Sequence, residues 1–178
     1  MQTTVAIPRP AADEHHEYYG AYIAKTPGED LFEALRLTAD SLLDLAAGVR
    51  DSQALHRYAP GKWSVKEVLN HVVDSERVFA YRALHFARTD PAPLPGFDET
   101  LWTPAARSDR RPLAAIVAEF RAVRDATAQL FGSFDAEALV RRGEASECIF
   151  TVRALGWSIA GHTRHHELIL RERYGLGR

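Results

Sequence analysis

The chain carries four stretches in which apolar residues recur every three or four positions, and this spacing restricts its possible folds more than any other feature. Such a repeat places apolar side chains along one face of an α-helix. Helices are therefore predicted over residues 29–47, 64–88, 112–132 and 151–174. Only residues 145–150 suggest a short extended piece, and the sequence has no internal repeat. These features predict an all-α protein built as a four-helix bundle.

The second predicted helix has the clearest start. Ser64 can cap the backbone amide of Glu67, and the Glu67 side chain can reach back to Ser64, which together make a capping box. Trp63 can pack on Val68 as a hydrophobic staple. Further boundary signals are Pro112 at the start of the third helix, Thr151 as the cap of the fourth, and Gly175 as its stop.

Composition narrows the class of protein. With 178 residues and 46% hydrophobic residues, one domain with a sizeable core is expected. Residues 1–17 lack a repeat and are predicted to form an extended or loosely docked N-terminal arm, and residues 18–178 a single bundle domain. The net charge of -2 and pI near 6.4 offer no basic surface for nucleic acid, so no nucleic-acid partner is expected.

The sequence also argues against a membrane protein. No stretch has the roughly 18 to 20 uninterrupted apolar residues of a membrane span, and the N-terminus shows neither a basic leader nor an apolar signal core. The one cysteine, Cys148, cannot form an internal disulfide. A cytoplasmic protein without a membrane partner is therefore expected. Cys148 is predicted to lie in a loop with a structural rather than a catalytic role.

Three histidines face the predicted core. On a helical projection His162 and His166 lie in the apolar stripe of the fourth helix, whereas His165 lies on its shoulder. His71 lies at the edge of the apolar face of the second helix. One such histidine is more often a hydrogen-bonded core residue, but rings at i and i+4 with a third from a facing helix are typical of a metal site. Nickel, zinc, copper and iron all suit imidazole.

Other kinds of metal site do not fit the sequence. No glutamate has a histidine three residues later, as a di-iron bundle requires, and there is no His-Glu-x-x-His motif or cysteine pair. A mononuclear three-histidine site remains, with coordination positions open to water or substrate. That pattern is typical of catalytic rather than structural metals.

Three segments of the sequence resemble the DinB/YfiT-like superfamily of metal-dependent proteins: YAPGKWSVKEVLNHVVDSERVFAYRALHFAR (58–88), LPGFDETLW (94–102) and GHTRHHELILRERY (161–174). The resemblance runs from about residue 18 to 174. It implies an up-down-down-up bundle, commonly a homodimer, with a long crossover between the second and third helices. Residues 90–111, predicted to be an irregular connection, are long enough to supply that crossover.

The resemblance also implies a divalent ion, often nickel or zinc, held by His71, His162 and His166, with His165 in a supporting role. Related proteins are S-transferases that use bacillithiol or mycothiol, or thiol-dependent isomerases. The chain is therefore predicted to be a metal-dependent enzyme, a thiol S-transferase with a low-molecular-weight thiol as cosubstrate. The alternative is a metal- or ligand-binding stress-response protein without turnover. No catalytic residue is assigned.

Several further residues are candidates with two interpretations. Glu67, Asp74 and Glu76 can orient a ligating histidine or transfer a proton, but capping and solvent-facing roles are equally open to them. Arg82 is predicted to pair with an acidic group or to reach an anion of a small-molecule substrate. In the crossover, Phe97 and Trp102 are placed to cover the site, and Gly156 and Gly161 are expected where helices approach closely.

Overall fold

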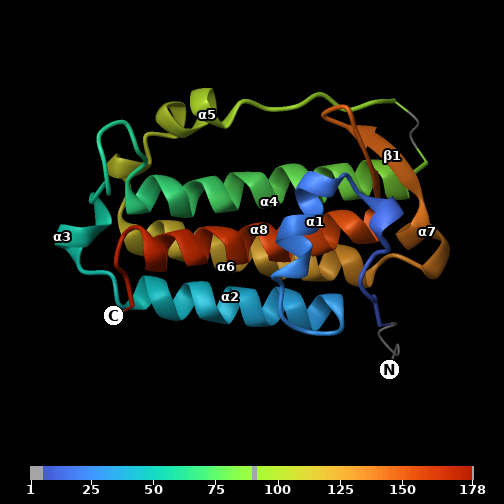
Figure 1. Ribbon diagram of the computed structural model, residues 1–178, viewed down its shortest axis with the longest axis horizontal. Helices are drawn as coiled ribbons and strands as arrows, with labels where there is room; N and C mark the ends of the chain where they lie inside the picture. The colour runs from blue at the N-terminus through green and yellow to red at the C-terminus, as the bar shows by residue number, and fades with distance from the viewer. Residues whose placement is uncertain (1–5, 90–91, 178) are drawn as a thin grey trace.

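The computed structural model describes residues 6–89 and 92–177. Four long helices lie side by side along its long axis: α2 (Leu31–Ala47), α4 (Val65–Ala87), α6 (Leu113–Gly132) and α8 (Val152–Glu172). In Figure 1, α2 and α8 run in one direction and α4 and α6 in the other. The predicted all-α bundle with up-down-down-up topology is therefore confirmed.

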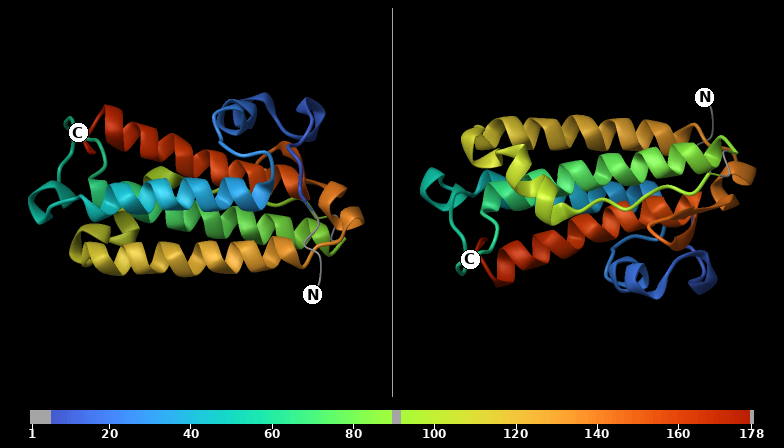
Figure 2. Two further views of the ribbon diagram at one scale, coloured as in Figure 1. Left: turned by 90° about the horizontal axis from the view of Figure 1, so that it is seen from below. Right: turned by 90° about the horizontal axis from the view of Figure 1, so that it is seen from above.

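The crossover from α4 to α6 follows the outside of α4, as Figure 1 and the right panel of Figure 2 show. Its first two residues, 90 and 91, lie outside the described part of the chain. Residues 92–98 form no helix or strand, as predicted, but the prediction of an irregular connection is wrong further on, where the crossover contains α5 (Glu99–Ala106) and the 3-10 helix η2 (Ser108–Arg110). Asp98 caps α5 by accepting the Thr100 amide at 2.8 Å. Pro104 lies inside α5, and because proline usually interrupts a helix, the sequence pattern did not predict one here.

The N-terminal segment holds the 3-10 helix η1 (Ala12–Glu14) and α1 (Glu17–Ala24), which lies across α8 in Figure 1. Residues 1–5 of the predicted arm lie outside the described chain. The part from residue 6 is firmly docked rather than loose: Ile7 is 1% exposed, and its amide donates to Asp30 Oδ1 at 2.6 Å. Trp157 donates its indole N–H to the Pro8 carbonyl at 3.1 Å. A domain boundary at residue 17 stays a prediction.

A small β-hairpin precedes α8. Its strands, β1 (Arg142–Ala145) and β2 (Cys148–Thr151), pair in antiparallel register. Cys148 therefore lies in a strand, not in the predicted loop. Ser146 and Glu147 connect the strands with φ angles of 53° and 60°. The extended piece expected at 145–150 corresponds to the second strand and this turn. Two further short helices lie at the ends of the bundle, α3 (Asp51–Ala54) at one end and α7 (Ala136–Val140) at the other.

The predicted helix boundaries follow the capping signals closely. Ser64 Oγ accepts the Glu67 amide at 3.1 Å, and Glu67 Oε2 accepts the Ser64 amide at 2.8 Å. Thr151 Oγ1 accepts the Ala154 amide at 3.2 Å. Pro112 occupies the cap position of α6, one residue before the position expected, and Gly175 follows α8 with a φ of 67°. Side-chain capping therefore fixes where α4 and α8 begin.

Two glycines of α8 allow neighbouring elements to approach closely, as predicted. A Cβ on Gly161 would lie 2.7 Å from the Tyr22 carbonyl oxygen of α1. A Cβ on Gly156 would lie 2.6 Å from Leu31 Cδ2 of α2. Neither distance leaves room for a methyl group. Gly161 thereby lets α1 lie directly over the middle of α8.

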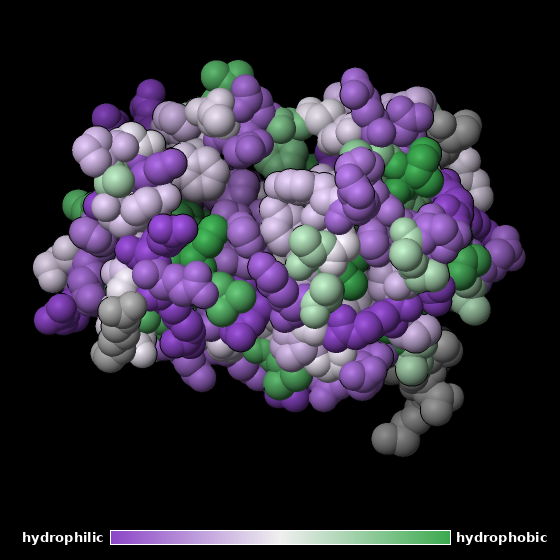
Figure 3. All heavy atoms as spheres, viewed as in Figure 1, coloured by the Kyte–Doolittle hydropathy of each residue, from purple (hydrophilic) through white to green (hydrophobic). Residues whose placement is uncertain are grey.

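The core fills the space between the long helices in two clusters of buried apolar residues, one towards each end of the bundle. On the face shown in Figure 3, hydrophilic side chains predominate and apolar ones are scattered among them. Within the described residues, no helix is both long and apolar enough to cross a membrane.

Candidate metal centre

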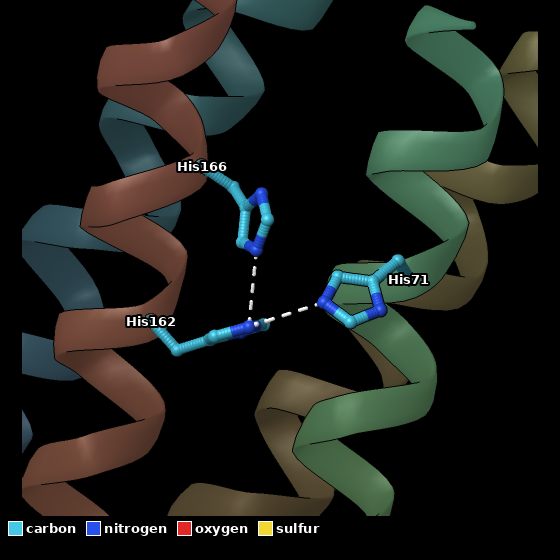
Figure 4. Close-up of side chains that lie close together, drawn as sticks. All are labelled: His71, His162 and His166. Carbon is cyan, nitrogen blue, oxygen red and sulfur yellow. Dashed lines mark hydrogen bonds between the residues drawn. The ribbon is translucent and has the colours of Figure 1, made fainter. Parts of the chain in front are cut away.

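Three histidine side chains from two helices point toward one another between α4 and α8 (Figure 4). Nε2 of His162 lies 3.2 Å from Nε2 of His71 and 3.1 Å from Nε2 of His166. One ligand atom from each of the three lies within 4.8 Å of the others. The i, i+4 spacing on α8 stacks His162 and His166 one turn apart, and the antiparallel packing of α4 brings His71 to meet them.

This spacing fits a single ion better than it fits hydrogen bonds alone. Nitrogens held about 2.1 Å from one ion at angles of about 90–110° lie about 3.0–3.4 Å apart. By contrast, a neutral ring nitrogen carries either one proton or one lone pair. Nε2 of His162 therefore cannot make two full hydrogen bonds, one to His71 and one to His166. The two nitrogen–nitrogen distances therefore suit lone pairs that share one cation better than they suit a pair of hydrogen bonds.

Burial keeps these imidazoles neutral at physiological pH. Burial lowers the pKa of His71 to about 4, against the opposing effect of the Glu99 charge. It also lowers the pKa values of His162 and His166 well below the usual value, with neighbouring histidines adding to the effect. A neutral ring offers a lone pair, which is the form that binds a metal.

One atom of the cluster has no hydrogen bond. Nδ1 of His166 is buried and finds no partner anywhere in the described residues. Around His71, the Ser75 hydroxyl lies 3.4 Å from Nε2, and the Trp63 ring centroid lies 4.8 Å from the imidazole centroid. The cluster is thus held by ring packing more than by hydrogen bonds. An unpartnered nitrogen is unusual in a buried group, but Nδ1 points away from Nε2 and so is not one of the three nitrogens that meet.

A pocket of about 260 Å³ opens directly onto the histidines. Its walls come from five parts of the chain: α1, the start and middle of α4, the crossover, the hairpin turn and α8. They comprise Tyr18, Tyr19, Tyr22, Trp63, Ser75, Phe79, Arg82, Phe97, Glu99 and Ser146, together with His71, His162, His165 and His166. A small molecule that enters this pocket therefore meets the ring nitrogens.

The three carboxylates singled out on the second helix do not serve the histidines. Glu67 closes the capping box and pairs with Arg57. Glu76 is buried and accepts two hydrogen bonds from Arg124, at 2.9 and 2.8 Å. Asp74 accepts the Asn70 amide at 2.7 Å. Each has a structural partner, so none is in position to orient a histidine or transfer a proton in the pocket.

The structure contributes pocket residues that the sequence did not reveal. Glu99 of α5 lines the pocket, and its charge raises the pKa of His71 against the effect of burial. Tyr22 of α1 contacts both His162 and His165, with ring centroids 6.0 and 4.8 Å apart. Only the run of tyrosines at 18, 19 and 22 hinted at a helical face there, and Gly20 within it weakened that signal.

The two crossover aromatics have different positions. Phe97 lines the histidine pocket, as expected, whereas Trp102 does not line it but packs on Phe97 with ring centroids 4.9 Å apart. His165 lines the pocket beside the three converging rings without joining their nitrogens. Arg82 lines the pocket too. It was predicted either to pair with an acidic group or to reach a substrate anion, and no acidic partner is found among the described residues.

Comparison with known structures supports the fold. The chain is similar to YfiT from Bacillus subtilis, with 20% sequence identity and a TM-score of 0.71 over 94% of this chain and 93% of that one. That protein is described as "a probable metal-dependent hydrolase with an unusual four-helix bundle topology". At this identity the likeness speaks for the fold alone.

Sequence comparison gives the family. No curated protein matches the chain significantly. The family model of the DinB superfamily matches residues 34–170, which include His71, His162 and His166 and all four long helices except the first residues of α2 and the last of α8. The match covers most of the chain. The protein therefore belongs to the DinB superfamily.

Proposed function

We propose that this chain is a metal-dependent enzyme in which His71, His162 and His166 hold one divalent ion, nickel or zinc, and that it is a thiol S-transferase. It would join the sulfur of a small thiol to a carbon of an organic electrophile, with release of the thiol proton and of the leaving group on that carbon. The observation that carries the proposal is the meeting of three neutral imidazoles at a pocket rather than inside a sealed core. Three protein ligands leave coordination positions open to an incoming molecule.

A divalent ion supplies one function in such a site: it lowers the pKa of a bound thiol or water and so provides a nucleophile near neutral pH. The other functions of the pocket come from side chains of the protein. Glu99 is the carboxylate that lines it in the described residues, and it would accept the proton that the nucleophile releases. The rings of Trp63, Tyr22 and Phe97 exclude water from around the histidines.

A binding protein without turnover is the alternative function. Such a protein is expected to close the coordination sphere with a fourth side chain. Within the described residues, the group of candidate ligands has three members, all histidines. That number favours the enzyme over the binding protein.

Hydrolysis is a second candidate reaction. It is favoured by the description of the YfiT structure as a probable metal-dependent hydrolase, on a fold that matches this chain over nearly its full length. The same pocket would then use water in place of a thiol. The two reactions differ in the cosubstrate, so a direct assay separates them.

The test is turnover by the zinc- or nickel-loaded protein, with a panel of low-molecular-weight thiols and monochlorobimane as the electrophile. We expect metal-dependent thioether formation that is lost in His166→Ala and retained in His56→Ala, a histidine outside the pocket. Ester cleavage without any thiol would favour the hydrolase. No metal-dependent turnover in either assay would contradict an enzyme and leave the stress-response binding protein.

The oligomeric state and the cellular location are part of the same proposal. A homodimer and a cytoplasmic location are expected from the family resemblance and the lone cysteine, Cys148. Sedimentation equilibrium of the full chain tests the dimer. Elemental analysis of protein purified without an affinity tag identifies the ion, because three imidazoles do not by themselves discriminate between nickel and zinc.

A further inference from the structure

A second cavity, of about 380 Å³, lies between α4 and the crossover and adjoins the histidine pocket. Its walls are mainly apolar and include Val78 and Tyr81 of α4 and Leu94, Phe97 and Trp102 of the crossover. Two side chains, Phe97 and Arg82, line both cavities. A molecule in the apolar cavity therefore reaches the wall of the histidine pocket at Arg82.

Arg82 is buried without an acidic partner. It is 2% exposed, and its Nη2 donates to the Pro95 carbonyl oxygen at 3.1 Å and to Ser146 Oγ at 2.7 Å. No aspartate or glutamate in the described ranges forms an ion pair with it. Burial lowers the pKa of Arg82, and the neighbouring Tyr19 hydroxyl opposes that effect. A buried cation that meets only neutral acceptors is destabilising unless an anion joins it.

The other charges of the apolar cavity are already paired. Arg77 lies 2.6 Å from Glu119 Oε1 and 3.7 Å from Asp74 Oδ1. These groups therefore neutralise one another at the edge of the cavity. Arg82 is left as the charge that an incoming molecule can neutralise.

We propose that the apolar cavity binds an organic monocarboxylate, with its apolar body between α4 and the crossover and its carboxylate at Arg82. A cavity of this size suits a small organic molecule. A guanidinium with hydroxyl neighbours recognises a carboxylate through charge-assisted hydrogen bonds. A single charge also suits the site, because a mainly apolar cavity with one unpaired cation among its described lining residues disfavours a dianion such as phosphate.

The bound acid would be a substrate placed beside the histidines, and that identification rests on the proposed function. Binding of the acid does not, because Arg82 and the apolar cavity need no metal. The proposed enzyme activity and the proposed acid binding can therefore be disproved separately. Loss of turnover with intact acid binding would overturn the enzyme alone.

The experiment is calorimetric titration of the full chain, metal-free and zinc-loaded, with sodium benzoate, benzamide and inorganic phosphate. We expect benzoate to bind both forms with similar affinity. Benzamide, which has the same shape without the charge, should bind about tenfold or more weakly. Arg82→Gln should weaken benzoate binding to a similar extent, whereas Arg36→Gln, at an exposed ion pair on α2, should leave it unchanged.

Val78→Trp tests the cavity independently, because it fills the apolar cavity and leaves Arg82 in place. It should abolish benzoate binding, which keeps the proposal testable if Arg82→Gln does not fold. The proposal is overturned if benzoate does not bind, or if benzamide or phosphate binds as tightly. It is also overturned if His166→Ala rather than Arg82→Gln removes benzoate binding, since the acid would then bind at the histidines.

Discussion

Two buried polar clusters, which both include residues of α4 and α8, differ in how completely the chain satisfies them. In one, Arg124 of α6 donates to both oxygens of Glu76, to the Leu35 carbonyl oxygen at 2.6 Å and to Thr163 Oγ1 at 2.8 Å. In the other, three imidazoles face one another, and Nε2 of His162 lies 3.2 and 3.1 Å from two further Nε2 atoms without being able to hydrogen-bond fully to both. Polar groups that hold the bundle together find partners within it, whereas those of the histidine cluster are left for a ligand.

The largest effect is expected in the satisfied cluster. Glu76→Ala leaves the Arg124 guanidinium buried and unpaired, and should lower the free energy of unfolding by about 3–5 kcal/mol. Urea denaturation of the metal-free protein measures it. The double variant Glu76→Met with Arg124→Met should lose less than Glu76→Ala, because both charges are then removed. Equal losses in both variants would mean that the ion pair itself is not what the core requires.

The histidine cluster should respond in the opposite way. His166→Ala should weaken zinc binding by about 100-fold, since a zinc site of four ligands contributes about 10–16 kcal/mol and one ligand a share of about 3 kcal/mol. The metal-free variant should lose about 1–2 kcal/mol through the missing ring packing, less than Glu76→Ala, because the lost nitrogen made no full hydrogen bond. Competition titration and urea denaturation measure the two quantities. A large loss of stability with unchanged zinc affinity would make His166 a structural residue like Glu76.

The close contact between α1 and α8 at Gly161 should contribute somewhat less to the free energy of unfolding. Gly161→Ala places a methyl group 2.7 Å from the Tyr22 carbonyl oxygen and should cost about 2 kcal/mol. A lower melting temperature is expected, although alanine has the higher helix propensity. Gly48→Ala at the end of α2, where a Cβ meets its nearest atom at 3.6 Å, is the matched control. A rise in melting temperature for Gly161→Ala would show that α1 does not press on α8.

The smallest effect is expected at a satisfied carboxylate nearer the surface. Burial tends to raise the pKa of Glu14, but hydrogen bonds from Arg153, the Ala11 backbone and Thr151 outweigh it and lower the pKa to about 2. The folded state thus binds this proton less readily than the unfolded state. The stabilisation is present above about pH 4.5 and is lost as the pH falls towards 2.

Replacing that carboxylate tests the pH dependence. Glu14→Gln should cost about 1 kcal/mol at pH 7, less than the Glu76 and Gly161 variants, because solvent screens Arg153. The difference in unfolding free energy from the unaltered protein should shrink between pH 4.5 and 2, as followed by circular dichroism. A difference that stays constant with pH would exclude the ion pair as its cause.

Much of this fold could be predicted because its signals are local. The capping box at Ser64, the cap at Thr151 and the apolar spacing in the four long helices act within a few residues of one another. The histidines belong to the same class, because His162 and His166 share one face of one helix. Bundle packing then brings His71 close to them.

What could not be predicted depends on contacts distant in sequence or on unusual turns. The hairpin turn at Ser146 and Glu147 has two positive φ angles without the asparagine or glycine that usually announces it. The partner of Glu76 lies 48 residues away, so the pattern of the second helix gave no sign of that ion pair. Glu99 reaches the pocket only because α5 forms within the crossover.

The most direct test is anomalous diffraction at the zinc edge, from crystals of the full chain grown with one equivalent of zinc. We predict one peak at about 2.1 Å from Nε2 of His71, His162 and His166 together. A peak elsewhere, or none, with the three rings still in mutual contact would contradict a metal centre built by α4 and α8.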